Sequence, residues 1–148
     1  MDIKKVELFK STLEEKKLKI ACAESITAGL LSSTIASVPG ASNILRASIV
    51  TYNEEIKTLL LNVQTETLKV KTAESAETTK QMLEGLIKMG LRADIYVAVT
   101  GAASAKNPDS PYKQEADQGQ IYVSIKVKEN FNHFEYRFFG TDIQCMLS

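Results

Sequence analysis

Residues 18–29 read Leu-Lys-Ile-Ala-Cys-Ala-Glu-Ser-Ile-Thr-Ala-Gly, and they decide which fold this sequence can adopt. The apolar segment 18–22 predicts a short strand, and residues 23–29 then lead into a helix predicted over 27–38. A serine at such a junction lies where backbone N–H groups and the helix dipole favour negative charge. Ser25 is therefore a candidate for contact with a phosphate group or with the oxyanion of a reaction.

The rest of the chain alternates predicted helices with apolar strands. Helices are predicted over 3–16, 54–61, 65–69 and 76–89, with Asn53 and Ser75 as N-caps and Gly90 as the stop. Strands are predicted over 47–52 and 95–99, followed by a hairpin of 121–127 and 134–138 with its turn at 129–132. This order predicts an α/β fold, a three-layer α/β/α sandwich around a mixed, mostly parallel sheet.

In such a fold ligands bind beyond the carboxyl ends of the strands. The loops expected there are 23–27, 52–55 and the long polar stretch 100–118. A loop as long as 100–118 is usually functional or mobile. The candidate functional residues lie in these loops or beside them.

Composition excludes several classes of function. The 148 residues suit one domain, and 18 basic residues balance 18 acidic ones, so no nucleic-acid surface is expected. No apolar run is long enough to cross a membrane and no signal core follows Met1, so a cytoplasmic location is expected. Cys22, Cys145 and His133 lack metal-ligand spacing; Cys22 is expected in a buried strand and His133 in a turn. With no phosphate-binding or dinucleotide glycine motif either, neither metal nor cofactor is expected.

Ser25, Tyr52 and Lys57 are the candidate catalytic residues for amide hydrolysis. A serine hydroxyl needs a base, and Lys57 could serve if burial lowered its pKa. Tyr52 could hold the serine or donate to the oxyanion. Spacing alone favours a simpler interpretation, in which Ser25 only caps the helix and Lys57 is a solvated surface lysine, because most lysines are exposed.

Six further residues are assigned to substrate binding: Glu24, Thr27, Gly29, Ser42, Thr100 and Gly101. Glu24 could instead orient Lys57 or lie on the surface, and Thr27 could be the N-cap of its helix. Ser42 belongs to a segment that could also be an ordinary turn. Gly101 would let backbone approach a ligand closely.

Several motifs of this chain resemble those of the CinA C-terminal domain family, the nicotinamide mononucleotide amidases. The resemblance runs from about residue 9 to 140. The motifs that carry it are Ala-Glu-Ser-Ile-Thr-Ala-Gly at 23–29, Pro-Gly-Ala-Ser at 39–42, Val-Thr-Tyr-Asn-Glu-Glu-Ile-Lys at 50–57, Glu-Ser-Ala at 74–76 and Val-Thr-Gly-Ala-Ala-Ser at 99–104.

The resemblance implies a three-layer α/β/α fold that hydrolyses nicotinamide mononucleotide to nicotinic acid mononucleotide and ammonia, a step of NAD metabolism. The family's catalytic serine, tyrosine and lysine fall on Ser25, Tyr52 and Lys57. The implied partner is a small nucleotide substrate, with helix N–H groups stabilising the oxyanion, and a homodimer is a further possibility.

The sequence departs from the family where the phosphate of the substrate would bind. Residues 104–111 replace a glycine-rich stretch, Ala116 replaces a basic residue, and Asp142 replaces an arginine. Lys106 and Lys113 could compensate for the lost charges. The family usually continues into a further helix, which this chain is expected to lack. The alternatives to the implied activity are therefore an amidase with another substrate, or a nucleotide-binding or regulatory domain without catalysis.

Overall fold

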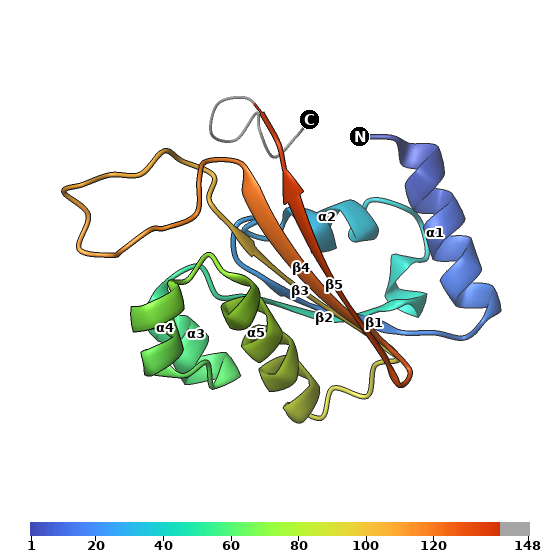
Figure 1. The fold of residues 1–148 in the computed structure, drawn as a ribbon. Helices are drawn as coiled ribbons and strands as arrows, with labels where there is room; N and C mark the ends of the chain where they lie inside the picture. The colour runs from blue at the N-terminus through green and yellow to red at the C-terminus, as the bar shows by residue number, and fades with distance from the viewer. Residues whose placement is uncertain (140–148) are drawn as a thin grey trace.

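A computed structural model describes residues 1–139 (Figure 1). The residues discussed above at 140–142 and 145 lie outside this range. The elements, in chain order, are α1 (Ile3–Glu15), β1 (Ile20–Glu24), α2 (Leu30–Ala36), the 3-10 helix η1 (Ala41–Asn43), β2 (Leu45–Val50), α3 (Glu54–Leu61), α4 (Thr65–Lys71), α5 (Ala76–Lys88), β3 (Ile95–Gly101), β4 (Gln120–Val127) and β5 (Asn130–Arg137).

The five strands form one mixed sheet in the order β2-β1-β3-β4-β5. β1 pairs in parallel with β2 and β3, whereas β4 pairs antiparallel with β3 and β5. α1 and α2 lie on one face of the sheet, and α3, α4 and α5 lie on the other (Figure 1). The predicted three-layer α/β/α sandwich with a mixed sheet is confirmed.

Alternation along β1 distributes its side chains between two cores. Ala21 and Ala23 pack in the core beneath α5, whereas Ile20 and Cys22 pack in the core beneath α1 and α2. Continued by one step, the same alternation sends Glu24 toward α2. The next residue, Ser25, therefore lies on the α3–α5 side of the sheet. The candidate base Lys57 belongs to α3 and lies on the same side.

Caps and helical spacing predicted the α3–α5 layer well. Asn53 caps α3 by accepting a hydrogen bond from the Glu55 N–H at 2.8 Å, and Ser75 caps α5 by accepting from the Thr78 N–H at 3.1 Å. The predicted inner face of α5 is buried: Thr79, Met82, Leu83 and Leu86. These two helices position the loops that precede them.

Several predicted boundaries were wrong. β1, β2 and β5 are displaced by two to four residues at one or both ends from the predicted strands 18–22, 47–52 and 134–138. Two further errors have a local cause. α2 begins at Leu30 rather than at 27, because Ala28 and Gly29 both have positive φ and form a turn first. The hairpin turn is Lys128–Glu129, not 129–132, and Lys128 takes the left-handed conformation at φ 54°. His133 is therefore inside β5, opposite Ser124, rather than in a turn.

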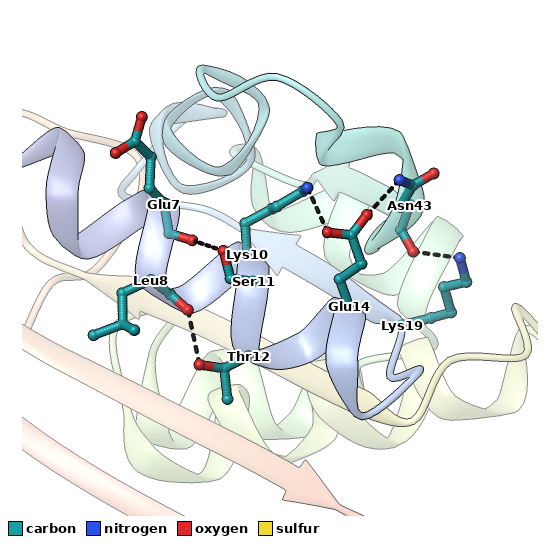
Figure 2. Close-up of polar contacts among 8 residues, drawn as sticks. All are labelled: Glu7, Leu8, Lys10, Ser11, Thr12, Glu14, Lys19 and Asn43. Atoms are coloured by element: carbon teal, nitrogen blue, oxygen red, sulfur yellow. Dashed lines mark hydrogen bonds and ion pairs between the residues drawn. The ribbon is translucent and has the colours of Figure 1, made fainter.

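Polar contacts fasten α1 to η1 at the amino end of β2 (Figure 2). Glu14 near the end of α1 binds Lys10 at 2.5 Å and accepts from the Asn43 side chain at 2.6 Å. The Lys19 ammonium donates to the Asn43 carbonyl from the other side. η1 is therefore held at the edge of the sheet where β1 and β2 begin.

An apolar groove of about 640 Å³ runs between α1, α2 and the β3–β4 part of the sheet. Its lining includes Phe9, Leu31, Val97, Val123 and Ile125. Among residues 1–139, no helix is long and apolar enough to cross a membrane, and no cluster of three acidic, histidine or cysteine side chains could hold a metal ion.

Candidate active site

The carboxyl ends of β1, β2 and β3 meet at a small cavity of about 120 Å³. Four segments contribute to it: the loop after β1, the loop after β2, the long loop 102–119 after β3, and the turn between α4 and α5. Its lining residues are Ser25, Ile26, Tyr52, Glu74, Gly101, Ala102, Ala103, Ser104 and Gln114. The cavity lies where the topology of the fold predicts a ligand.

Ser25 and Lys57 meet at this cavity. The Lys57 Nζ lies 2.9 Å from the Ser25 Oγ, within hydrogen-bond distance. Ser25 is 6% exposed and Lys57 only 1%, although both are polar. Lys57 is therefore not a solvated surface lysine, and its hydroxyl partner reaches the cavity wall.

Two backbone carbonyls fix the orientation of the Lys57 amine. The Nζ donates to the Thr51 oxygen at 2.5 Å and to the Tyr52 oxygen at 3.1 Å. A neutral amine has two N–H donors and one lone pair. With both donors directed at carbonyls, the lone pair of neutral Lys57 faces the Ser25 hydroxyl.

Burial also prepares Lys57 to act as a base. Loss of water around the side chain disfavours its charged form and lowers its pKa from 10.5 to about 8. The carboxylates of Glu74 and Glu54 oppose this shift by favouring the ammonium. Lys57 therefore titrates near pH 8, much closer to the operating range of a general base than an exposed lysine does.

The structure gives Tyr52 a different contact from the one expected. Tyr52 is 66% exposed and lines the cavity, and its backbone carbonyl, not its hydroxyl, binds Lys57. At the next residue, the Asn53 side chain donates to the Tyr112 hydroxyl at 3.4 Å. This contact links loop 102–119 to the start of α3.

Glu24 is completely buried on the opposite side of the sheet and caps α2. Its carboxylate accepts hydrogen bonds at 2.7–3.1 Å from five donors: the hydroxyls of Thr27 and Ser48, and the backbone N–H groups of Gly29, Leu31 and Ser32. Burial alone would raise the pKa of Glu24, but these donors outweigh it and lower the pKa.

Three expectations change as a result. Glu24, Thr27 and Gly29 do not line the Ser25 cavity, so their assignment to substrate contact is corrected to support of the turn that holds Ser25. Glu24 also makes no hydrogen bond to Lys57. The backbone N–H groups at the start of α2 donate to the Glu24 carboxylate, so they are not available to bind an oxyanion.

Ser42 is also misplaced by the sequence argument. It is an exposed residue of η1, before β2, whereas the cavity lies after β2. The six residues of β2 separate the two points by roughly 20 Å. Ser42 therefore does not belong to the site.

Thr100 and Gly101 end β3 beside the cavity. The Thr100 hydroxyl donates to the Ala73 carbonyl at 3.1 Å, and Thr100 is not among the residues that line the cavity. Gly101 lines the cavity, and a Cβ there would lie 2.4 Å from the Gln120 carbonyl oxygen. Glycine is required at 101 for the approach of β4.

Glu74 is the residue that sequence reasoning missed as part of the site. It lines the cavity beside Ser25, and its Oε2 is buried without a hydrogen-bond partner. Burial raises its pKa, and Lys57 partly opposes the rise. An acidic residue just before a helix cap is usually exposed, so the local sequence carried no signal of this position.

Among the residues outside the site, Cys22 is a buried strand residue, as expected, and burial raises the pKa of its thiol to about 12. The His133 Nδ1 lies 2.8 Å from the hydroxyl of Ser124, a buried residue of β4. Neither residue reaches the Ser25 cavity.

Comparison with known proteins agrees with this architecture. The family model of the CinA C-terminal domain matches residues 3–147. The chain is 37% identical over 126 residues to a CinA-like protein of Petrotoga mobilis. The aligned region covers 85% of this chain and 30% of that protein. It is 36% identical over 141 residues to a CinA-like protein of Thermotoga neapolitana, and that alignment covers 94% of this chain and 33% of the relative. The chain thus spans about a third of the length of these relatives.

Solved structures show the same fold. The competence/damage inducible protein CihA from Agrobacterium tumefaciens superposes with a TM-score of 0.85 at 30% identity, covering 99% of this chain and 88% of that one. The competence damage-inducible protein A from Klebsiella pneumoniae also gives 0.85, at 22% identity, covering 97% of this chain and 86% of that one. By the family match over nearly its whole length, this chain belongs to the CinA C-terminal domain family.

Proposed function

We propose that this chain is an amidohydrolase that removes ammonia from the carboxamide of nicotinamide mononucleotide. The observation that carries the proposal is the buried contact of 2.9 Å between the Lys57 amine and the Ser25 hydroxyl. A buried lysine with a pKa near 8 is costly for folding and suits a general base. The serine beside it opens onto a cavity at the carboxyl ends of the strands.

The reaction would proceed through an acyl-enzyme. The Ser25 oxygen attacks the carboxamide carbon while Lys57 takes the hydroxyl proton. The tetrahedral intermediate collapses as the Lys57 ammonium returns that proton to the nitrogen, which leaves as ammonia. Lys57 then takes a proton from water, which attacks the ester, and returns it to Ser25 as the acid product departs.

The oxyanion of this intermediate needs donors other than the first turn of α2. Candidate donors are the backbone N–H groups of Ile26 and Ala103, since both residues line the cavity. Backbone donors held by a strand end or a tight turn suit this role because they need no reorganisation during the reaction.

The phosphate of the substrate would lie beyond the cavity along the same loop. A second hollow of about 490 Å³ is lined by Lys106 and Arg137, among other residues, and it adjoins Ala103 and Ser104 through the chain. Lys106, which lines this hollow, would then take the place of a lost basic residue. Lys113 does not line the hollow, so we do not assign it the same role.

One observation favours a second candidate, an amidase whose substrate has no phosphate. Asp117 lies 3.3 Å from the Lys106 amine and 3.6 Å from the Arg137 guanidinium, so both cations already have an anionic partner. Hydrolysis of nicotinamide mononucleotide and of its phosphate-free riboside distinguishes the two. A Lys106→Ala variant raises the KM for the mononucleotide alone if phosphate binds there.

Ammonia release from nicotinamide mononucleotide tests the main proposal. Ser25→Ala and Lys57→Met remove the two groups at nearly unchanged volume, and Ser33→Ala and Lys80→Met alter exposed residues of the same types. The proposal requires turnover in the wild type and both controls, and its loss in both site variants. A folded wild-type protein that binds the nucleotide without turnover would instead be a binding domain.

A further inference from the structure

The turn that carries Glu74 is held in a strained conformation. Thr72, a β-branched residue at the end of α4, has φ 70° and ψ 168°. Such residues rarely adopt positive φ, and the cost is accepted mainly where the surroundings fix the backbone. The strained residue lies two positions before Glu74.

Buried hydrogen bonds lock the same turn on both sides of Glu74. The Thr72 carbonyl accepts from the hydroxyls of Ser75 at 3.1 Å and Thr78 at 2.7 Å. The Ala73 carbonyl accepts from the Thr100 hydroxyl at 3.1 Å. The backbone of Glu74 is thus tied both to α5 and to the end of β3, which leads into the cavity.

The Glu74 side chain on this turn has one carboxylate oxygen that accepts no hydrogen bond. The Glu74 Oε2 is buried and has no hydrogen-bond partner among the described residues. A buried carboxylate oxygen without a hydrogen bond destabilises the folded protein. A backbone hydrogen bond to the Glu74 carboxylate and the nearby charge of Lys57 offset only part of the cost of burying it, because its pKa is still raised. Glu74 lines the same cavity as Ser25, so a ligand that fills the cavity would lie against this side chain. A small rotation of the carboxyl group would then let the ligand supply the missing donor.

We propose that the Glu74 carboxyl group accepts a hydrogen bond from the nitrogen of the scissile carboxamide, and so makes the site selective for amides over esters. The proposal rests on the hydrolytic function proposed above. A primary carboxamide offers two N–H donors, whereas an ester of the same acid offers none. A donor–acceptor contact at the nitrogen also holds the leaving group in place for the proton that Lys57 returns.

Glu54 provides a matched control. Like Glu74, it is a glutamate whose charge raises the pKa of Lys57 and whose own pKa is raised by burial. It begins α3 and lines a different surface hollow, not the Ser25 cavity. Replacing Glu54 therefore changes the field at Lys57 without removing a contact to the substrate.

The test compares kcat/KM for nicotinamide mononucleotide with that for the methyl ester of nicotinic acid mononucleotide. The proteins are the wild type, Glu74→Gln, Glu74→Leu and Glu54→Gln. Loss of a hydrogen bond to a charged group is expected to lower the value for the amide by about tenfold or more, with the largest loss in Glu74→Leu. The value for the ester should change far less, and Glu54→Gln should leave the amide-to-ester ratio at its wild-type value.

Thermal unfolding of the same proteins separates binding from folding. Removal of an unpaired buried oxygen should leave the unfolding midpoint of Glu74→Leu equal to or above that of the wild type. The role of Glu74 would be overturned if the wild type is active and both Glu74 variants keep its amide-to-ester ratio. It would also be overturned if the Glu74 variants unfold at a lower temperature and lose kcat/KM equally for both substrates. Either result would leave the hydrolytic function itself standing. A wild type that hydrolyses neither compound would overturn the hydrolytic function itself, and this role with it.

Discussion

Lys57 should make the stability of this protein depend on pH in a way that one substitution removes. Its pKa is about 8 in the folded protein and 10.5 when exposed, so the unfolded chain binds the proton more tightly. The contribution of Lys57 to the free energy of unfolding is therefore lowest below pH 8. It rises between about pH 8 and 10.5, where only the unfolded state holds the proton. The two pKa values set the rise at about 3 kcal/mol, an upper estimate.

Lys57→Met keeps the length of the side chain and removes the titrating group. The assay is urea unfolding of both proteins at a series of pH values from 6 to 10.5, because the difference between the two curves cancels the other titrating groups. The wild-type free energy of unfolding should gain on that of the variant only above about pH 8. Parallel curves across the whole range would show that Lys57 has an ordinary pKa, and the argument for a neutral base would fail.

Three further predictions concern separate parts of the structure. Gly85→Ala should lower the unfolding midpoint, although alanine usually stabilises a helix interior, because its Cβ would lie 1.9 Å from the Leu61 carbonyl oxygen; a raised midpoint would contradict that packing. Glu24→Gln should destabilise the fold by about 2–4 kcal/mol in urea unfolding, since an amide cannot accept from all five donors; a loss below about 1 kcal/mol would refute this account of the cap. The kcat/KM of the wild type for nicotinamide mononucleotide should rise about tenfold per pH unit up to about pH 8 and then level off, as neutral Lys57 becomes the main form; a flat profile would exclude it as the base.

Local signals in the sequence were enough to predict the α3–α5 layer. Asn53 and Ser75 are caps whose side chains act within three residues, so the starts of α3 and α5 were predicted correctly. The start of α2 was not, because its cap is the Glu24 carboxylate at the end of the preceding strand, which reaches five to eight residues ahead. Local capping patterns do not extend over that distance.

The candidate site was predictable in part for the same physical reason. Ser25 and Lys57 are 32 residues apart, and strand order together with alternation along β1 brings them to one side of the sheet. Spacing alone could not decide whether Lys57 is buried, since burial depends on packing between layers. Glu74 could not be found at all, because its position depends on the strained turn at Thr72 and on the contact between Thr100 and Ala73.

The most direct test of the serine–lysine mechanism is to look for the acyl-enzyme itself. The protein would be mixed with the methyl ester of nicotinic acid mononucleotide, quenched in acid within milliseconds to seconds, and measured by intact and peptide mass spectrometry. The account predicts an acyl adduct on the peptide that contains Ser25, absent in Ser25→Ala and reduced at low pH as Lys57 becomes protonated. Turnover without an adduct, undiminished in Ser25→Ala, would contradict it.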